Sequence, residues 1–133
     1  MTVRAHFALL HAVLILCGFA VVPASALAHA GTGPHGGPVT DAGPYYVELI
    51  LKDGQLRLFA FDDKSDAPVS AKSAHGTATV LIGDKKQTVE LEPVSGPDDN
   101  LLGGSLAAAG PGARIVIILR FPGQPSMIAR FVI

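Results

Sequence analysis

The chain has 133 residues, is 49% hydrophobic, and carries 10 Lys and Arg against 11 Asp and Glu, a formal net charge of −1. Neither sign of charge forms a run along the sequence, so nucleic acid and anionic membrane surfaces are poor candidates as partners. Trp is absent and only two Tyr are present, which argues against an aromatic sugar-binding platform. The length suits one compact domain.

Residues 1–28 have the pattern of a secretory signal peptide. Arg4 supplies the positive n-region, residues 7–22 form an apolar stretch, and residues 26–28 are Ala-Leu-Ala, which suits a cleavage site. Pro23 directly after the stretch weakens a membrane-spanning interpretation. We therefore expect export to the periplasm or the exterior, with no stable membrane insertion after cleavage.

The cleavage position decides the fate of one histidine. A cut after residue 28 leaves His29 as the N-terminus, where its α-amine and imidazole can bind one metal ion together, or where it simply begins an unstructured terminus. A cut before Gly31 removes it. Cys17 lies within the signal after Leu16, where a lipid-modified cysteine requires a small neighbour, so a lipoprotein anchor is not expected.

Residues 29–44 include five Gly and three Pro, which disfavour a helix or a central strand. We therefore predict a flexible arm. It carries His29 and His35, and imidazole is the commonest metal ligand in proteins. Asp41 offers an oxygen ligand from the same arm.

Residues 45–133 alternate with the period of strands, and no long segment repeats at 3.6 residues. Val47 and Leu49 share one face and Glu48 lies on the other, while Asp53-Gly54 indicates a tight hairpin. The apolar run 115–119 is typical of a central strand covered on both faces. Strands are expected over about residues 45–52, 55–61, 76–82, 87–92, 101–106, 114–121 and 127–133. About seven short antiparallel strands predict an immunoglobulin-like β-sandwich, with a small β-barrel as the alternative.

His75 stands at the head of one predicted strand. A ligand there is held by the sheet, so His35 and His75 would converge if the arm folds back; otherwise His75 is a surface histidine in a loop. With no cysteine after the signal and Met127 the one methionine, Cu(II) or Zn(II) is favoured over Cu(I), and nickel or cobalt also suit imidazole.

Other chemistry is poorly supported. Asp62, Asp63 and Asp66 lack the spacing, central Gly and terminal Glu of the familiar calcium loop. No nucleophile elbow and no phosphate-binding loop before a helix is present. An oxidase built on His29 and His75 would need an extended substrate surface that the sequence does not offer. We therefore expect a protein that is not an enzyme.

Three motifs occur in a familiar order: His-Gly-Gly-Pro-Val at 35–39, Tyr-Val-Glu-Leu at 46–49 and Lys-Asp-Gly-Gln-Leu-Arg-Leu at 52–58. This order resembles small periplasmic proteins encoded with heavy-metal efflux systems. It also resembles the N-terminal β-domain of some periplasmic adaptor subunits of metal-exporting resistance-nodulation-division pumps. The resemblance implies a β-sandwich that binds or relays a transition metal in the periplasm, with His35 as the first ligand and components of an efflux pump as partners. Because the chain lacks the adaptors' coiled-coil and barrel domains, it would serve as a free carrier, buffer or accessory.

The sequence thus divides into a signal peptide (1–28), an arm (29–44) and a β-sandwich domain (45–133). The leading hypothesis is a metal-binding protein whose ligands come from His35, His75, His29 and Asp41. The competing hypothesis is a metal-free β-sandwich interaction module of the cell envelope whose histidines are incidental.

Overall fold

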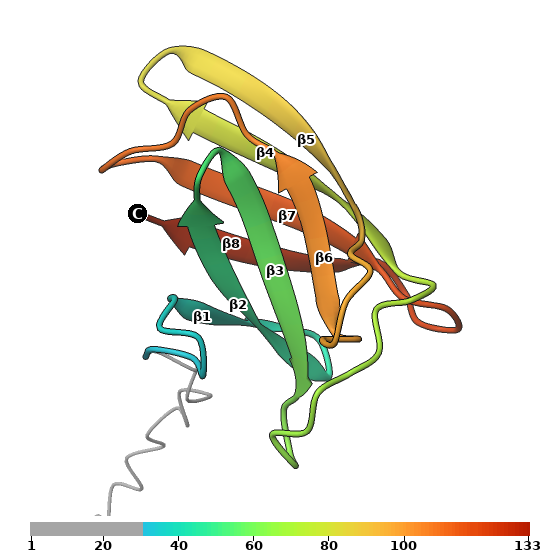
Figure 1. Ribbon diagram of the computed structural model, residues 1–133. Helices are drawn as coiled ribbons and strands as arrows, with labels where there is room; N and C mark the ends of the chain where they lie inside the picture. Colours follow the sequence, from blue (N-terminus) through green and yellow to red (C-terminus); the bar gives the residue numbers. More distant parts are fainter. Residues whose placement is uncertain (1–30) are drawn as a thin grey trace, which may run out of the picture.

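A computed structural model describes residues 31–133, and the predicted signal peptide and His29 lie outside this range (Figure 1). The described residues form eight strands and no helix, so the all-β prediction is confirmed. Nor do they include an apolar helix of bilayer-spanning length. The strands are Val39–Ala42 (β1), Tyr45–Lys52 (β2), Gln55–Asp62 (β3), His75–Ile82 (β4), Lys85–Pro93 (β5), Leu101–Ser105 (β6), Arg114–Arg120 (β7) and Met127–Val132 (β8).

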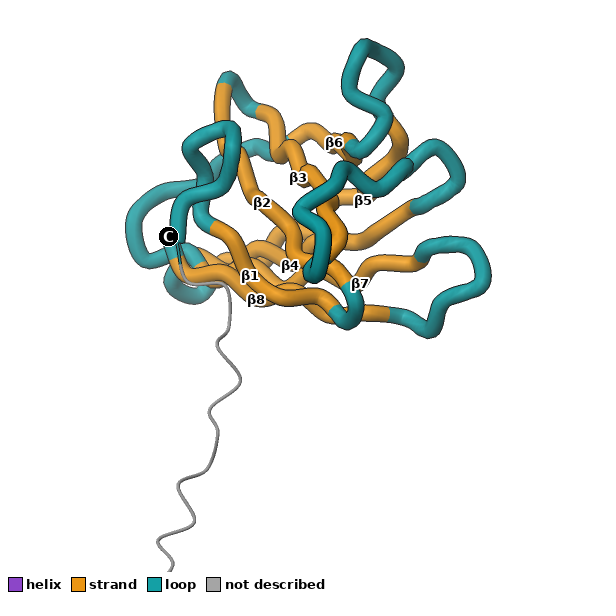
Figure 2. The backbone as a smooth tube through the Cα atoms, turned by 90° about the horizontal axis from the view of Figure 1, so that it is seen from below, coloured by secondary structure: helices purple, strands orange, loops and turns teal. Residues whose placement is uncertain are grey.

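All strand pairs are antiparallel, in the order β1-β2-β3-β6-β5-β4-β7-β8. We call β1, β2, β3 and β6 the first sheet, and β5, β4, β7 and β8 the second sheet. Seen from below, β2, β3 and β6 lie in one layer and β4, β7 and β8 in the other (Figure 2). β1 also contacts β8, so the strands form one nearly closed sheet that fits a sandwich or a small barrel.

The main core lies between the two layers, because alternate residues of every long strand point inward. Val47 and Leu49 of β2 face Ile115 and Ile117 of β7 across this core, and all four are buried. The expectation that the run 115–119 is covered on both faces is wrong in one respect. Ile118 points outward and is 40% exposed, since no further layer covers β7 on that side.

The turn between β2 and β3 is the one that the sequence predicted. Asp53 and Gly54 both have positive φ, 52° and 70°, as a two-residue type I′ hairpin requires. This turn fixes the register in which Leu49 pairs with Leu58. The residues of β2 and β3 that belong to the main core therefore point to the same side of the sheet.

The ladder between β5 and β6 is short. It joins Glu92 to Gly103 and Pro93 to Leu102, which leaves most of β5 beyond the end of β6. There the Gln87 side chain accepts a hydrogen bond from the N–H of Ala107 at 2.8 Å and donates one to the Ala108 carbonyl at 3.1 Å. The segment after β6 is thereby tied to the edge of β5.

The arm differs from the expected flexible segment. Residues 33–37 form a closed turn, in which Gly33 N–H donates to the Gly37 carbonyl at 2.8 Å, and residues 39–42 form β1 on the edge of the first sheet. The prediction excluded only a helix or a central strand, and an edge strand tolerates Gly and Pro at its ends. The arm becomes ordered because it finds partners on β2.

Candidate functional site

The outward face of the first sheet carries a second hydrophobic cluster beneath the arm. Its buried members are Tyr46 of β2, Phe59 and Phe61 of β3, and Leu101 of β6. Tyr46 and Phe61 stack with ring centroids 5.0 Å apart. Outward-facing residues of a two-layer fold normally meet water, so this cluster depends on the segments that lie over it.

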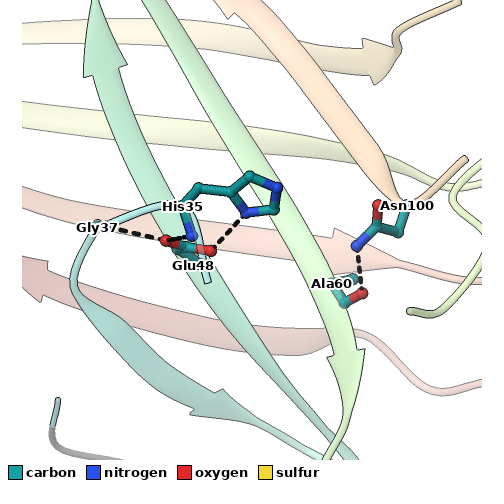
Figure 3. Close-up of polar contacts among 5 residues, drawn as sticks. All are labelled: His35, Gly37, Glu48, Ala60 and Asn100. Atoms are coloured by element: carbon teal, nitrogen blue, oxygen red, sulfur yellow. Dashed lines mark hydrogen bonds and ion pairs between the residues drawn. The ribbon is translucent and has the colours of Figure 1, made fainter. Parts of the chain in front are cut away.

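Glu48 lies on the same face and is fully buried, with 0% of its surface exposed. Its Oε1 accepts hydrogen bonds from the backbone N–H groups of His35 and Gly37, both at 2.8 Å. Its Oε2 lies 2.8 Å from Nδ1 of the His35 ring (Figure 3). Three hydrogen bonds to one carboxylate compensate for its removal from water and hold the arm against β2.

Glycines allow this close approach. A Cβ atom added at Gly33 would lie 2.7 Å from Glu48 Oε2, inside any real van der Waals contact. A Cβ at Gly37 would collide with the Leu49 carbonyl of β2. Gly36 has a φ of +87°, which a residue with a side chain rarely adopts. Glycine is therefore required at these three positions of the turn that holds the carboxylate.

The His35 ring is held on two sides. It stacks on Phe59 with a centroid distance of 3.8 Å and an interplanar angle of 14°. Its Nδ1 bonds Glu48, and its side chain remains 38% exposed. The second ring nitrogen, Nε2, points away from Glu48 (Figure 3). The imidazole is thus fixed in orientation while one nitrogen stays available.

The tautomer follows from the hydrogen bonds of Glu48. A carboxylate only accepts, and its Oε1 already takes two N–H groups, so we assign the proton of the His35–Glu48 bond to Nδ1. In neutral imidazole this leaves the lone pair on Nε2. The pair therefore presents an oriented nitrogen ligand or hydrogen-bond acceptor at the surface.

Tyr46 extends the polar network at the edge of the cluster. Burial raises the pKa of its phenol, and the charge of Asp66, a hydrogen bond to Asp66 and the charge of Glu48 raise that pKa further. Each of these causes disfavours the phenolate. Tyr46 therefore remains a neutral donor beside the carboxylates and has no role as a base.

The structure separates the histidines that the sequence proposed to converge. His35 lies on the outward face of the first sheet, whereas His75 is the first residue of β4, opposite Arg120 of β7. His75 has the same parity as Thr77, outward on the second sheet, because the intervening Gly76 is buried. The main core lies between the two rings, so they do not share one ion within a chain.

Of the two remaining candidate ligands, Asp41 lies within the described residues and His29 does not. Asp41 is in β1, paired in register with Tyr46 of β2, and His29 lies outside the described residues. Within residues 31–133, no three His, Cys, Asp or Glu side chains gather closely enough to hold a metal ion. A set of three such ligands around His35 would therefore need at least one group from outside this part of the chain.

Sequence reasoning overlooked Glu48. It was placed correctly on the face opposite Val47 and Leu49, but nothing in the alternation shows that this face is covered. The available signal was its position within the otherwise apolar segment Tyr-Tyr-Val-Glu-Leu-Ile-Leu at 45–51, where a lone carboxylate requires a partner. Comparisons with protein-family models, curated proteins and solved structures give no match. The function is therefore argued from the geometry of the site.

Proposed function

We propose that this protein is exported and binds a borderline divalent transition-metal ion through Nε2 of His35. It would act as a periplasmic carrier, buffer or accessory of a heavy-metal efflux system. The observation that carries the proposal is the 2.8 Å bond between His35 Nδ1 and the buried Glu48 carboxylate. It supports a metal-binding role because metal-ligating histidines almost always donate their other ring N–H to such an acceptor.

The donor set limits the ion. A neutral imidazole suits Cu(II), Zn(II), Ni(II) and Co(II), and the hydrogen bond to Glu48 fixes the orientation of the ring. His35 supplies one ligand, so the remaining positions would be filled by water, by His29 if it is the mature N-terminus, or by the molecule that receives the metal. A site with few protein ligands suits transfer better than storage.

The first test compares metal uptake by tag-free protein beginning at His29 with that of protein beginning at Gly31. Zn(II), Cu(II), Ni(II) and Co(II) would be titrated separately by competition with a chromophoric chelator. His35→Ala is expected to lower the affinity at least about 10-fold, because it removes the ligand. His75→Ala is the matched control and should bind like the parent protein. Equal uptake by the parent and His35→Ala would overturn the proposal.

A subtler variant tests the role of Glu48. Glu48→Gln keeps the side-chain shape, but its amide N–H₂ donates to Nδ1 and moves the ring proton to Nε2. Metal affinity should fall by about 10-fold to 100-fold while the arm stays docked. The ¹⁵N shifts of the His35 ring report the tautomer directly. Unchanged affinity with a switched tautomer would contradict the proposed coordination by Nε2.

The second candidate is a metal-free interaction module of the cell envelope. The observation that favours it is that His35 already has a structural partner in Glu48 and a stacking partner in Phe59. Under this alternative, His35→Ala loosens the arm and no ion binds specifically. Loss of metal binding on acidification would favour the first candidate, since an imidazole must be neutral to coordinate.

A further inference from the structure

On its outward face, the second sheet carries exposed apolar side chains along β7 and β8. Ile118 of β7 lies directly opposite Ile128 of β8, and the two are exposed by 40% and 44%. Val116 is the next outward residue along β7, and Val132 has the same outward parity on β8. Single exposed apolar residues need no explanation, but a group of neighbours of this kind is typical of an interaction surface.

Three arginines are interleaved with this apolar patch. Arg114 and Arg120 stand at the two ends of β7, and Arg130 of β8 lies opposite Val116. All three are exposed, and none forms an ion pair within the described part of the chain. Arg120 donates a hydrogen bond from Nε to the Ser126 hydroxyl at 3.3 Å, which orients its guanidinium. The patch is therefore bordered by cations whose counter-charges the described residues do not supply.

The other half of this face, on β4 and β5, carries the carboxylates. Thr77 of β4 lies beside Ile118 and donates a hydrogen bond to Glu90 of β5 at 3.2 Å. Glu92 is exposed on β5 as well, while Lys86, near the start of that strand, adds a further cation. The carboxylates thus lie two strands away from β7. A broad anionic surface over the whole face would meet them, whereas a narrow segment over β7 and β8 meets only arginines.

We propose that the β7–β8 half of this face binds an acidic polypeptide segment of a partner protein. Arginine and carboxylate groups form paired, charge-assisted hydrogen bonds, which suits a segment that bears Asp or Glu side chains. An apolar side chain of the same segment would pack on Ile118 and Ile128 at the centre of the patch. A lipid surface is disfavoured, because a flat anionic membrane would also approach Glu90 and Glu92. The charges therefore select a narrow acidic partner.

The strand register sets the spacing of the acidic side chains. In an extended segment alternate side chains face the sheet, so its first, third, fifth and seventh side chains match successive outward rows along β7. These rows hold, in order, Arg114, Arg130, the Ile118–Ile128 pair and Arg120. The matching segment is acidic at its first, third and seventh positions and apolar at its fifth. This pattern defines a probe.

The probe is an N-acetylated, C-amidated peptide with the sequence Glu-Ser-Glu-Ser-Val-Ser-Glu. It would be titrated into ¹⁵N-labelled protein while the amide shifts are followed by NMR. Saturable shifts centred on β7 and β8, with a Kd of about 1 mM or tighter, are expected. A matched peptide with Lys in place of Glu should not bind, because it meets the arginines with like charge. Absence of saturable shifts, or equal binding of both peptides, would overturn the inference.

Three variants test the proposed surface. Arg130→Glu should lower the affinity for the acidic peptide at least about 10-fold, since repulsion replaces a charge-assisted hydrogen bond. Ile118→Ser should lower it roughly 5-fold, because an apolar contact is lost without a change in charge. Arg57→Glu, an exposed arginine of β3 on the first sheet, is the matched control and should bind like the parent protein. Circular dichroism verifies the fold of each variant. Equal weakening by Arg57→Glu and Arg130→Glu would show a response to net charge alone and refute the surface.

Two further measurements address other occupants of this face. Vesicles of equal parts phosphatidylglycerol and phosphatidylcholine should not retain the protein at about 0.15 M salt. Sedimentation velocity at the concentration used for NMR should show a monomer. Retention on the vesicles, or a dimer, that Arg130→Glu abolishes would assign the face to lipid or to a second copy and overturn the inference. None of these measurements involves His35 or Glu48, so their failure leaves the proposed metal site untouched.

Discussion

The two outward faces of this molecule have the same strand alternation but different surroundings. On the first sheet, Tyr46, Phe59 and Phe61 point outward and are buried. The arm lies over this cluster through His35, which stacks on Phe59. On the second sheet, Ile118 and Ile128 point outward and remain exposed. Whether an outward residue becomes core is therefore decided by segments distant in sequence.

The difference in burial between the two outward faces also depends on one charged group. The arm is held to the first sheet by Glu48, which accepts hydrogen bonds from His35 and Gly37, and its hydrophobic contacts lie around that carboxylate. A buried carboxylate is costly unless it is hydrogen-bonded. This requirement fixes the conformation of the arm more narrowly than apolar packing alone would.

The largest effect is expected from Phe59→Ala, which removes the ring under His35 and leaves a cavity in the covered cluster. The free energy of unfolding should fall by about 3 kcal/mol. Ile128→Ala on the uncovered face should change it by less than about 0.5 kcal/mol. Urea denaturation at low protein concentration measures both. Equal losses would show that the two faces do not differ energetically.

Glu48→Ala should cause the next largest loss in the free energy of unfolding. It leaves the N–H groups of His35 and Gly37 without their acceptor, and Gly37 N–H is buried, so we expect a loss of about 2 kcal/mol. Amide exchange should rise across residues 33–39, reporting release of the arm. Glu90→Ala, an exposed carboxylate on the second sheet, is the matched control. If the exchange of the arm amides is unchanged, Glu48 is not what holds the arm.

Gly33→Ala tests how closely the arm packs against the side chain of Glu48. The added methyl group lies within 2.7 Å of Oε2, so the carboxylate or the turn must shift, at a cost of about 1 kcal/mol or more. Gly31→Ala meets nothing within 4 Å and should have no comparable effect. Thermal unfolding of the two variants compares them directly. Indistinguishable melting temperatures would contradict the close contact.

The smallest predicted effect is a change in the pKa of Asp62, in the turn that follows β3. Hydrogen bonds from the Ser65 hydroxyl, and then from the backbone N–H groups of Ser65 and Lys64, hold the pKa of Asp62 below its usual value of 3.8. The stabilisation is present above that value and is lost as pH falls through the lowered pKa. Ser65→Ala should move the pKa back toward 3.8, as NMR titration of the carboxyl would show. A pKa that stays low would assign the effect to the backbone alone.

Local pattern was enough to predict the seven longer strands. The Asp53-Gly54 hairpin and the alternation of residues such as Val47 and Leu49 are short-range signals, and both appear in the structure. β1 was not predicted, because four residues between Pro38 and Gly43 carry little periodicity. Its existence depends on pairing with β2, which a local pattern does not encode.

The candidate site was predicted only in part. His35 was recognised from residue type and a Gly-rich setting, whereas its partner Glu48 was hidden within a strand. The expected meeting of His35 with His75 required knowledge of which layer each strand joins. That information resides in the strand order, where β2 and β4 belong to different sheets.

The side chain of Gln87 has a consequence for behaviour at high concentration. A free strand edge offers peptide groups on which another chain can assemble, and this is a common route to fibrous aggregates. A primary amide has the same donor and acceptor as a peptide group, so the bonds of Gln87 to Ala107 and Ala108 continue the ladder by one rung after β6 has ended. One side chain thus shields an edge that would otherwise need a longer strand.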